Sequence, residues 1–319
     1  MSRPKVCVII NPVSGTESKQ SIPEMVAAAF DQKKYKVVFH ITGFPGQATG
    51  ITRKAVKKGY QYVICAGGDG TVNEVAKAMV NTECTLGIIP FGSGNGLARE
   101  LGIPLNAEGA IDIILQENVR VIDYGIANDH IFFTTCGVGF DAFISDKFAD
   151  NNQRGPLGYV RNVLESVFDF RAETYEITHD GGVFEEKAFI VTCANASQYG
   201  NDAFIAPSAD IEDGKMNLSI LKPINALEIP QTTLQLFTKN IEKNGKMESF
   251  LTEKAVIKRS HPGVMHVDGE PLNTGEVVMV EMVKKGLRVL APSKSDKAEP
   301  RDNNIFSTIT RWLNIPSSN

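Results

Sequence analysis

The sequence predicts an α/β protein in which a doubly wound parallel sheet is followed by a mostly antiparallel β domain. Three observations support this class. Up to Leu115, short apolar runs alternate with helical patterns, as in βαβ units. Two of these runs end in glycine-rich turns that open a helix, at Gly67–Asn73 and Gly92–Gly96. From Arg120 onwards, strand-like runs are separated by turn signals such as Asp180-Gly181.

Strands and helices alternate through the first part of the chain. A continuous apolar run predicts a strand buried on both faces, and apolar residues three or four apart predict a helix. Ser21 and Glu24 have capping-box spacing at the start of the first helix. The expected strands are Val6–Ile10, Lys36–Thr42, Tyr62–Ala66 and Leu86–Pro90. The expected helices are Ile22–Phe30, a basic stretch that stops at Gly59, Val75–Val80, a helix that begins at Leu97–Leu101, and Ala110–Leu115.

The second part is expected to be antiparallel. Arg120–Ala127 and Ile131–Thr135 flank Asn128-Asp129, which is a hairpin signal. Further strands are expected at Thr174–Thr178, Ala188–Cys193, Leu218–Leu221, Ala255–Lys258, Val277–Met282 and Leu287–Leu290. Helical patterns occur at Tyr159–Phe168 and Leu227–Thr238.

Composition and charge narrow the class of protein. The 319 residues, 42% of them apolar, suffice for two domains with buried cores. The formal net charge of -4 provides no global basic field for nucleic acid. The five cysteines lack CxxC spacing, which predicts buried, reduced thiols in a cytosolic protein. No apolar run approaches the roughly 20 residues of a membrane span, so we expect membrane contact only from the surface.

The two glycine-rich turns predict a cradle for a polyphosphate. Glycine lets the backbone approach an anion, and a helix N-terminus offers free N–H groups and the positive end of a dipole. Thr71, Asn73 and Glu74 add polar side chains to the first turn, and Ser93 and Asn95 add them to the second. Neither turn is a Walker A loop or a GxGxxG motif. A single GGDG turn could equally use glycine only for positive φ, but the strand before it and the second turn favour the cradle.

Two further segments are expected at the same edge of the sheet. Asn11-Pro12-Val13-Ser14-Gly15 follows the first strand, and Thr42 ends the second. Asn, Pro, Ser and Gly are all turn formers, so an ordinary βα turn is the alternative to a phosphate-edge loop in the first segment.

Two acidic turns have open interpretations. Asp268-Gly269-Glu270 is favoured as a type I′ hairpin, and the alternative is a carboxylate pair that projects towards the phosphate site. Asp210–Lys215 holds three acids and is either a solvated turn or a site for a hard cation such as Mg²⁺. The five histidines show no metal-ligand spacing.

Taken together, the ordered motifs resemble the bacterial diacylglycerol kinase-like lipid kinases, which are related to sphingosine and ceramide kinases. The resemblance spans most of the chain. The motifs that carry it are Asn11–Gly15, Thr42 with Gly46-Gln47-Ala48, Gly67–Glu74, Pro90–Asn95, Gly137–Ala142, Ala206–Ala209 with Asp213-Gly214, and Asp268-Gly269-Glu270.

The resemblance implies a nucleotide domain like that of 6-phosphofructokinases and NAD kinases, a β-sandwich-like second domain, and ATP in the cleft between them. It implies an ATP-binding catalytic domain at residues 1–122, to which the segment 292–319 returns, and a β-rich lipid-substrate domain at residues 123–291. The implied ATP-binding residues are Asn11, Thr42, Gly67, Gly68, Asp69, Gly70, Thr71, Val72, Asn73, Glu74, Gly92, Ser93, Gly94 and Asn95.

The resemblance also implies roles for carboxylates. Glu270 is implied as the catalytic proton acceptor, and Asp69 is our second candidate for that base. Asp213, with the backbone carbonyls of Asp210 and Lys215, is implied as the holder of a Mg²⁺ that orders the site.

One departure from the family pattern is Gly96, which stands where many members carry an acid in the water network between the GGDG aspartate and Mg²⁺. We expect an ATP-dependent lipid kinase that phosphorylates a hydroxyl of diacylglycerol or a related lipid. The alternatives are a soluble NAD kinase-like enzyme and a non-catalytic, nucleotide-responsive lipid-binding protein. The expected partners are ATP, a lipid alcohol and, transiently, the inner face of the membrane, with no nucleic acid. The expected location is cytoplasmic, and a homodimer is the oligomer considered.

Overall fold

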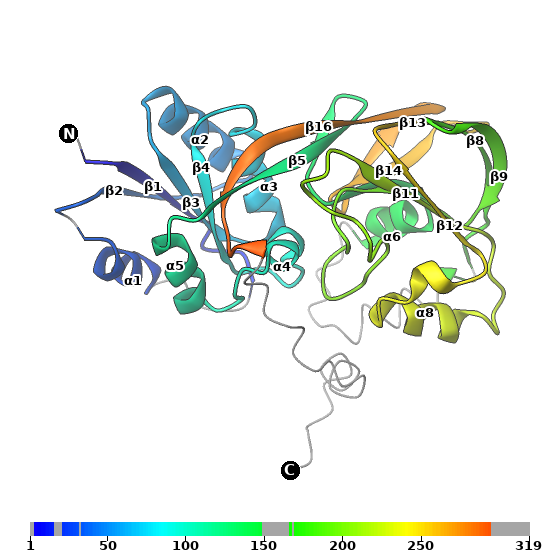
Figure 1. Cartoon of the computed structure of the whole chain (residues 1–319), viewed down its shortest axis with the longest axis horizontal. Coiled ribbons are helices and arrows are strands. Elements are labelled where there is room, and N and C mark those ends of the chain that lie inside the picture. The colour runs from blue at the N-terminus through cyan, green and yellow to red at the C-terminus, as the bar shows by residue number, and fades with distance from the viewer. Residues whose placement is uncertain (1–2, 16–20, 32, 149–165, 168, 295–319) are drawn as a thin grey trace, which may run out of the picture.

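The computed structural model describes residues 3–15, 21–31, 33–148, 166–167 and 169–294. These residues form two domains that share one sheet (Figure 1). Most of the helix expected at Tyr159–Phe168, and residues 295–319 of the segment expected to return to the first domain, lie outside the described residues. No helix in the described part of the chain is long and apolar enough to cross a membrane.

The first domain is the expected doubly wound unit. Its parallel strands lie in the order β2-β1-β3-β4. Helix α1 packs with α5 and α2 with α3, so the helices cover the two faces of the sheet in pairs (Figure 1). The strands are β1 (Lys5–Ile10), β2 (Lys36–Ile41), β3 (Tyr62–Gly67) and β4 (Thr85–Pro90). The helices are α1 (Ile22–Ala29), α2 (Gln47–Lys57), α3 (Asp69–Lys77), α4 (Gly96–Leu101) and α5 (Ala107–Leu115).

The capping box expected at Ser21 is wrong. Ser21 precedes α1, but its side chain makes no capping hydrogen bond. Its backbone is already helical, with φ -81° and ψ -12°, whereas a capping serine normally needs an extended backbone to aim its hydroxyl at the first turn.

The second domain adds an antiparallel sheet in the order β12-β11-β10-β7-β14-β15. These strands are β7 (Thr135–Gly139), β10 (Ile190–Ala194), β11 (Met216–Leu221), β12 (Met247–Thr252), β14 (Gly263–Val267) and β15 (Glu270–Thr274). The other strands, β5 (Val119–Ala127), β6 (His130–Phe132), β8 (Glu173–His179), β9 (Gly182–Ala188), β13 (Lys254–Lys258) and β16 (Val277–Leu290), extend the first sheet. The helical segments with described bounds in this part are α6 (Phe140–Phe148), α8 (Ile229–Phe237) and the 3₁₀ turn η1 (Ile241–Lys243).

Strand β16 joins the domains. Its first half pairs with β13, and its end pairs with β4 in parallel. The sequence predicts two strands here, at Val277–Met282 and Leu287–Leu290, but the structure has one long strand with an irregularity between Val283 and Leu287. Leu287 and the residues up to Ala291 already lie in the core of the first domain. The chain therefore returns to that domain before residue 292.

Two other expected strands are split by the structure. Ile131–Thr135 is divided between β6 and β7. Ala188–Cys193 is divided between β9 and β10, which belong to different sheets, with Phe189 at the crossing. In both cases the break falls inside a run of apolar and β-branched residues, which are typical of a single strand, so the sequence pattern alone gave no sign of it.

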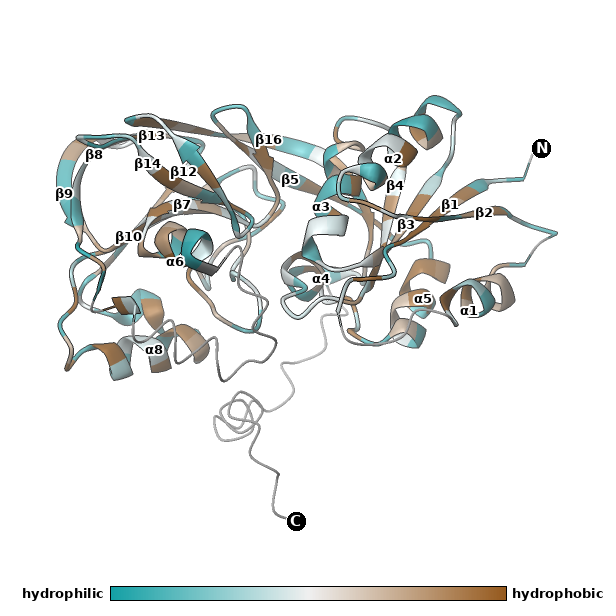
Figure 2. Ribbon diagram, turned by 180° about the vertical axis from the view of Figure 1, so that it is seen from behind, coloured by the Kyte–Doolittle hydropathy of each residue, from teal (hydrophilic) through white to brown (hydrophobic). Residues whose placement is uncertain are grey.

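Apolar strands form the cores. In Figure 2, β1, β3 and β4 are mostly brown, while α2 and α3 carry teal surfaces. All five cysteines are free and buried, as the sequence predicts. Burial raises the pKa of the Cys7 thiol to about 11, so this thiol is neutral at physiological pH.

Candidate active site

Three loops leave the carboxyl ends of β1, β3 and β4 at one edge of the parallel sheet. The loop after β1 is fastened by Asn11, whose backbone N–H donates to the carbonyl of Ala66 at 3.0 Å. Its side-chain Nδ2 donates to Thr71 Oγ1 at 2.9 Å. The predicted loops therefore meet at one edge of the sheet, beside the first turns of α3 and α4.

The glycines, which have no side chains, determine the shape of this edge. A Cβ placed on Gly68 would lie 3.2 Å from Gly92 Cα, and one placed on Gly92 would lie 2.9 Å from Gly68 Cα. A Cβ on Gly94 would lie 2.8 Å from Asp69 Oδ2. The two glycine-rich turns therefore touch backbone to backbone, and a side chain at either contact would force them apart.

Asp69 ties the two turns together. Its Oδ2 accepts the N–H of Asn95 at 2.8 Å, and its Oδ1 accepts the N–H of Gly96 at 2.7 Å. Asn95 has a left-handed backbone, and its side chain both accepts from the N–H and donates to the carbonyl of Gly92. Asp69 is half-buried, and both of its oxygens hold the backbone of the second turn.

Several expected nucleotide-binding residues support the loops from behind. Glu74 accepts the N–H groups of Gly46 at 2.7 Å and Ala48 at 3.1 Å, so it caps the start of α2. The Thr42 hydroxyl is buried and donates to the carbonyl of Ile10. The buried residues of the set are Thr42, Gly67, Gly68, Thr71, Val72, Asn73 and Asn95. Gly70 and Ser93 are exposed, and Asn11, Asp69, Glu74, Gly92 and Gly94 are half-buried.

Two exposed apolar side chains at this edge were missed by the sequence analysis. Val13, after β1, is 85% exposed, and Phe44, after β2, is 65% exposed. β1 and β2 are parallel neighbours, so both residues follow strand ends at the same edge. An apolar residue inside a Gly/Pro-rich loop is the signal that could have found them. An exposed ring beside a phosphate cradle offers a flat face to a purine base.

Asp268-Gly269 forms the hairpin that the sequence favours. Asp268 has φ 50° and Gly269 has φ 82°, as a type I′ turn requires, and β14 pairs with β15 from Val267 and Glu270. Positive φ at both central positions explains a glycine in one of them.

The two carboxylates of this hairpin have different surroundings. Asp268 accepts the N–H groups of Phe133 and Thr134 at 3.0 and 2.8 Å, and the Thr134 hydroxyl at 2.6 Å. These bonds interrupt the expected strand between β6 and β7. Glu270 is exposed, and its Oε1 would lie 3.7 Å from a Cβ placed on Gly70. The Asp268 carboxylate therefore fixes the hairpin to Phe133 and Thr134, while the Glu270 carboxylate faces the first glycine-rich turn.

A buried polar cluster stands behind the hairpin. Asp141, from the Gly137–Ala142 motif, accepts the Thr192 hydroxyl at 2.7 Å and contacts His266 Nε2 at 3.0 Å. The Tyr199 hydroxyl lies 3.1 Å from the same Asp141 oxygen. The cluster links α6, β10 and β14, and β14 leads directly into the hairpin.

The second glycine-rich turn is also fixed to the second domain. Arg99 donates to the carbonyl of Gly94 at 2.9 Å and pairs with Asp202 at 3.2 Å. The buried carboxylate of Glu100 accepts the N–H of Ser197 at 2.9 Å and its hydroxyl at 2.5 Å. Sequence reasoning missed Glu100, because its partner is 97 residues away along the chain.

The acidic turn after Ala209 has a different character. Both carboxylate oxygens of Asp210 accept from Lys294 Nζ, at 2.9 and 3.0 Å. Asp213 is exposed, and its Oδ1 accepts the N–H of Lys215 at 2.8 Å. Within the described ranges, no three His, Cys, Asp or Glu side chains are grouped as metal ligands.

Asp213 is the acid of this turn that suits a cation, because Asp210 pairs with Lys294 and Glu212 pairs with Arg120 and Lys294. Asp123 is fully buried and accepts the N–H groups of Gly214 and Lys285, each at 2.6 Å. Burial raises the pKa of the Asp123 carboxyl, and the charges of Asp213 and Asp210 raise it further. The Asp213 carboxylate and nearby carbonyls are the oxygen donors that Mg²⁺ takes. The donor types therefore fit Mg²⁺ at Asp213, while Lys294 already neutralises the Asp210 side chain.

Comparison with known proteins shows which families this chain is similar to. Residues 5–127 match the family model described as the diacylglycerol kinase catalytic domain, and residues 134–291 match the YegS C-terminal NAD kinase beta sandwich-like domain. A diacylglycerol kinase of Bacillus subtilis (strain 168) is 32% identical over 228 residues, which cover 69% of this chain and 75% of that protein.

Solved structures agree with this fold. A crystal structure from Bacillus anthracis str. Sterne is 25% identical, covers 90% of this chain and 95% of its own, and has a TM-score of 0.74. A second structure from that organism, described as a diacylglycerol kinase, is 22% identical, covers 92% and 98% of the two chains, and has a TM-score of 0.70.

The class is therefore a two-domain kinase with a parallel-sheet catalytic domain and a β-sandwich-like second domain. Within that class, the chain belongs to the diacylglycerol kinase family. The resemblance drawn from the motifs and the fold class are both confirmed.

Proposed function

We propose that this kinase transfers the γ-phosphoryl group of ATP to a hydroxyl of diacylglycerol or a closely related lipid. The observation that carries the proposal is the position of Glu270, which extends from the second domain to within reach of Gly70 in the first glycine-rich turn. Phosphoryl transfer depends on positioning and charge neutralisation rather than covalent chemistry, and a carboxylate near the acceptor hydroxyl accepts its proton.

Each part of the site has a role in this scheme. The backbone around Gly68 and Gly92 binds the phosphates, and Asn11, Thr42 and Glu74 hold the loops in place. Phe44 and Val13 contact the base or ribose, since they are exposed at the same edge. Asp213 would hold a Mg²⁺, whose positive charge would help to order the acidic turn.

Glu270 is preferred over Asp69 as the base. Both oxygens of Asp69 accept backbone N–H groups, from Asn95 and Gly96, so its carboxylate already has partners within the loops. Glu270 is exposed and extends from the domain that we assign to the lipid. A proton acceptor must be within hydrogen-bond reach of the acceptor hydroxyl, which an exposed side chain at the domain boundary permits.

The acceptor is tested directly with the purified protein, labelled ATP and Mg²⁺. Diacylglycerol, sphingosine, ceramide, phosphatidylglycerol, undecaprenol and NAD are offered in parallel. We expect label in the phosphatidate fraction. Label in NADP instead would support an NAD kinase-like enzyme, and ATP binding without transfer to any acceptor would support a non-catalytic protein.

Replacing Gly68 with valine is expected to abolish ATP binding. The new side chain would press on Gly92 Cα, which already lies 3.2 Å from the Cβ position, and would cover the phosphate cradle. The measurement is the rise in Tm on adding ATP and Mg²⁺. Gly50→Val is the matched control, because a Cβ at Gly50 meets nothing within 4 Å, and it should keep the full rise. An equal ATP-dependent rise for Gly68→Val would contradict the cradle.

Replacing Asp213 with alanine is expected to lower activity and to raise the Mg²⁺ concentration needed for half-maximal activity. The change removes the exposed carboxylate of the acidic turn. The measurements are a Mg²⁺ titration of activity at saturating ATP and the Mg²⁺-dependent rise in Tm without ATP. Asp129→Ala, in the exposed β5–β6 turn, is the control. If Asp213→Ala and the parent chain gave identical titrations, the acidic turn would be a solvated turn and not a Mg²⁺ site.

A further inference from the structure

Among the residues that the structure describes, helix α8 and the turn before it present exposed apolar side chains. Leu227 is 91% exposed and Leu234 is 45% exposed, and Pro230 between them is also exposed. Pro230 and Leu234 are spaced i, i+4 on one side of α8, and Leu227 lies in the turn just before the helix. These three residues are called the α8 stripe below. Ile229 and Thr232 are buried on the other side. The helix is thus anchored to the domain and points apolar side chains at solvent.

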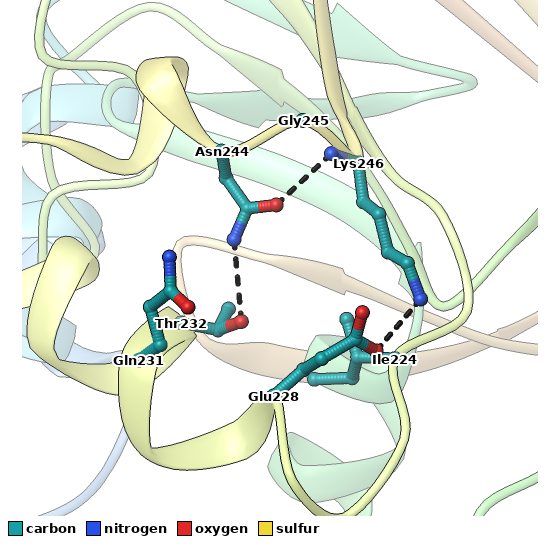
Figure 3. Close-up of a pocket in the computed structure, with 7 residues that line it drawn as sticks. All are labelled: Ile224, Glu228, Gln231, Thr232, Asn244, Gly245 and Lys246. Carbon is teal, nitrogen blue, oxygen red and sulfur yellow. Dashed lines mark hydrogen bonds and ion pairs between the residues drawn. The ribbon is translucent and has the colours of Figure 1, made fainter.

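The position of α8 suits contact with a flat surface. In both Figure 1 and Figure 2, α8 lies at the bottom of the second domain, while β5 and β16, which join the domains, lie at the top. A shallow pocket beside the stripe is lined by polar groups (Figure 3). Lys246 Nζ donates there to Glu228 Oε2 at 2.7 Å and to the carbonyl of Pro223 at 2.8 Å. Polar groups therefore adjoin the stripe directly.

Two exposed lysines follow the stripe along the chain. Of the four lysines in residues 222–246, Lys222 pairs with Glu186 and Glu248, and Lys246 pairs with Glu228. Lys239 and Lys243 are exposed. The ammonium of Lys239 lies 4.5 Å from the centre of the Phe204 ring, so its stem covers apolar surface and its charge remains at the water interface.

We propose that the α8 stripe docks this kinase on an anionic phospholipid bilayer. An interfacial helix binds such a surface by placing apolar side chains in the headgroup region, while neighbouring lysines are attracted to the anionic lipids. The proposal rests on the proposed function, because a kinase for a long-chain lipid meets that acceptor at a membrane. Leu227 enters the bilayer most deeply, since it is the most exposed of the large apolar side chains in the described ranges.

Insertion is measured with a fluorophore on a single cysteine. All five native cysteines are buried, so a maleimide dye should label Leu227→Cys selectively. With vesicles of phosphatidylcholine and phosphatidylglycerol, dye at residue 227 should shift to the blue and be quenched by brominated lipid. Dye on Val183→Cys, at a 63% exposed apolar residue of β9, should do neither. Equal responses at both positions, or none at residue 227, would overturn the proposal.

Binding is measured by sedimentation of the full chain with the same vesicles. The double variant Leu227→Asp/Leu234→Asp should bind at least about tenfold more weakly, because it removes apolar area and adds negative charge. Val183→Asp should bind like the parent chain, and added salt should weaken the parent's binding. A double variant that binds vesicles normally, or that instead converts a dimer to a monomer in light scattering, would overturn the proposal in favour of another occupant.

A soluble acceptor separates docking from catalysis. With dispersed dioctanoylglycerol, the double variant should keep the parent's kcat/KM, and its defect should appear only with vesicle-borne acceptor. If the parent chain phosphorylated no lipid and the double variant still lost vesicle binding, the docking proposal would stand. That result would count against the proposed function alone. Equal loss of activity on dispersed and vesicle-borne acceptor would contradict a docking role.

Discussion

Glu270→Gln is expected to lower kcat about 10²–10⁴-fold while leaving ATP affinity unchanged. The amide keeps the size and polarity of the side chain but cannot accept the proton of the acceptor hydroxyl. Glu270 is exposed, so folding should be unaffected. The measurements are steady-state kinetics with dispersed diacylglycerol and the ATP-dependent rise in Tm.

The matched control for this change is Glu276→Gln, at an exposed position just after β15. It should alter the free energy of unfolding by no more than about 0.5 kcal/mol and leave kcat at the parent value. If Glu270→Gln behaved like this control, the hairpin would be only a structural turn.

Asp69→Asn is expected to damage both binding and turnover. Its carboxylate accepts two N–H groups, from Asn95 and Gly96, and an amide can accept only one and presents N–H to the other. An unmet N–H and the lost charge cost about 1–3 kcal/mol. The second glycine-rich turn then loosens, so ATP affinity should fall together with kcat. Unfolding in urea and ATP titration measure the two effects.

The two variants together distinguish the candidate bases. A positional role for Asp69 predicts weaker ATP binding and lower stability in Asp69→Asn. If Asp69→Asn instead abolished transfer with ATP affinity and stability intact, and Glu270→Gln stayed active, Asp69 would be the base. Asp129→Asn, at an exposed turn, is the control for a charge change alone.

Local patterns in the chain were sufficient to predict the parallel sheet. β1 and β4 are buried apolar runs, and each glycine-rich turn sits between a strand and a helix, which places both at the carboxyl edge. The Asp268-Gly269 hairpin was likewise predictable, because positive φ at two adjacent positions has a strong local signature.

Long-range bonds could not be predicted in the same way. The break between β6 and β7 depends on Asp268, which lies 134 residues from Thr134. Glu74 appears in the motif as a ligand candidate, yet its oxygens cap α2. A motif identifies which polar residues occur near a site, but only packing decides which of them contact a ligand and which hold the loops.

The most direct test is transfer of label from γ-labelled ATP into chloroform-extractable lipid, with parent chain, Glu270→Gln and Gly68→Val compared at equal protein concentration. The account predicts labelled phosphatidate with the parent chain, about 10²–10⁴-fold slower labelling with Glu270→Gln, and none above background with Gly68→Val. Transfer to lipid that was equally fast with all three proteins would contradict it, as would a parent chain that binds ATP and labels no lipid.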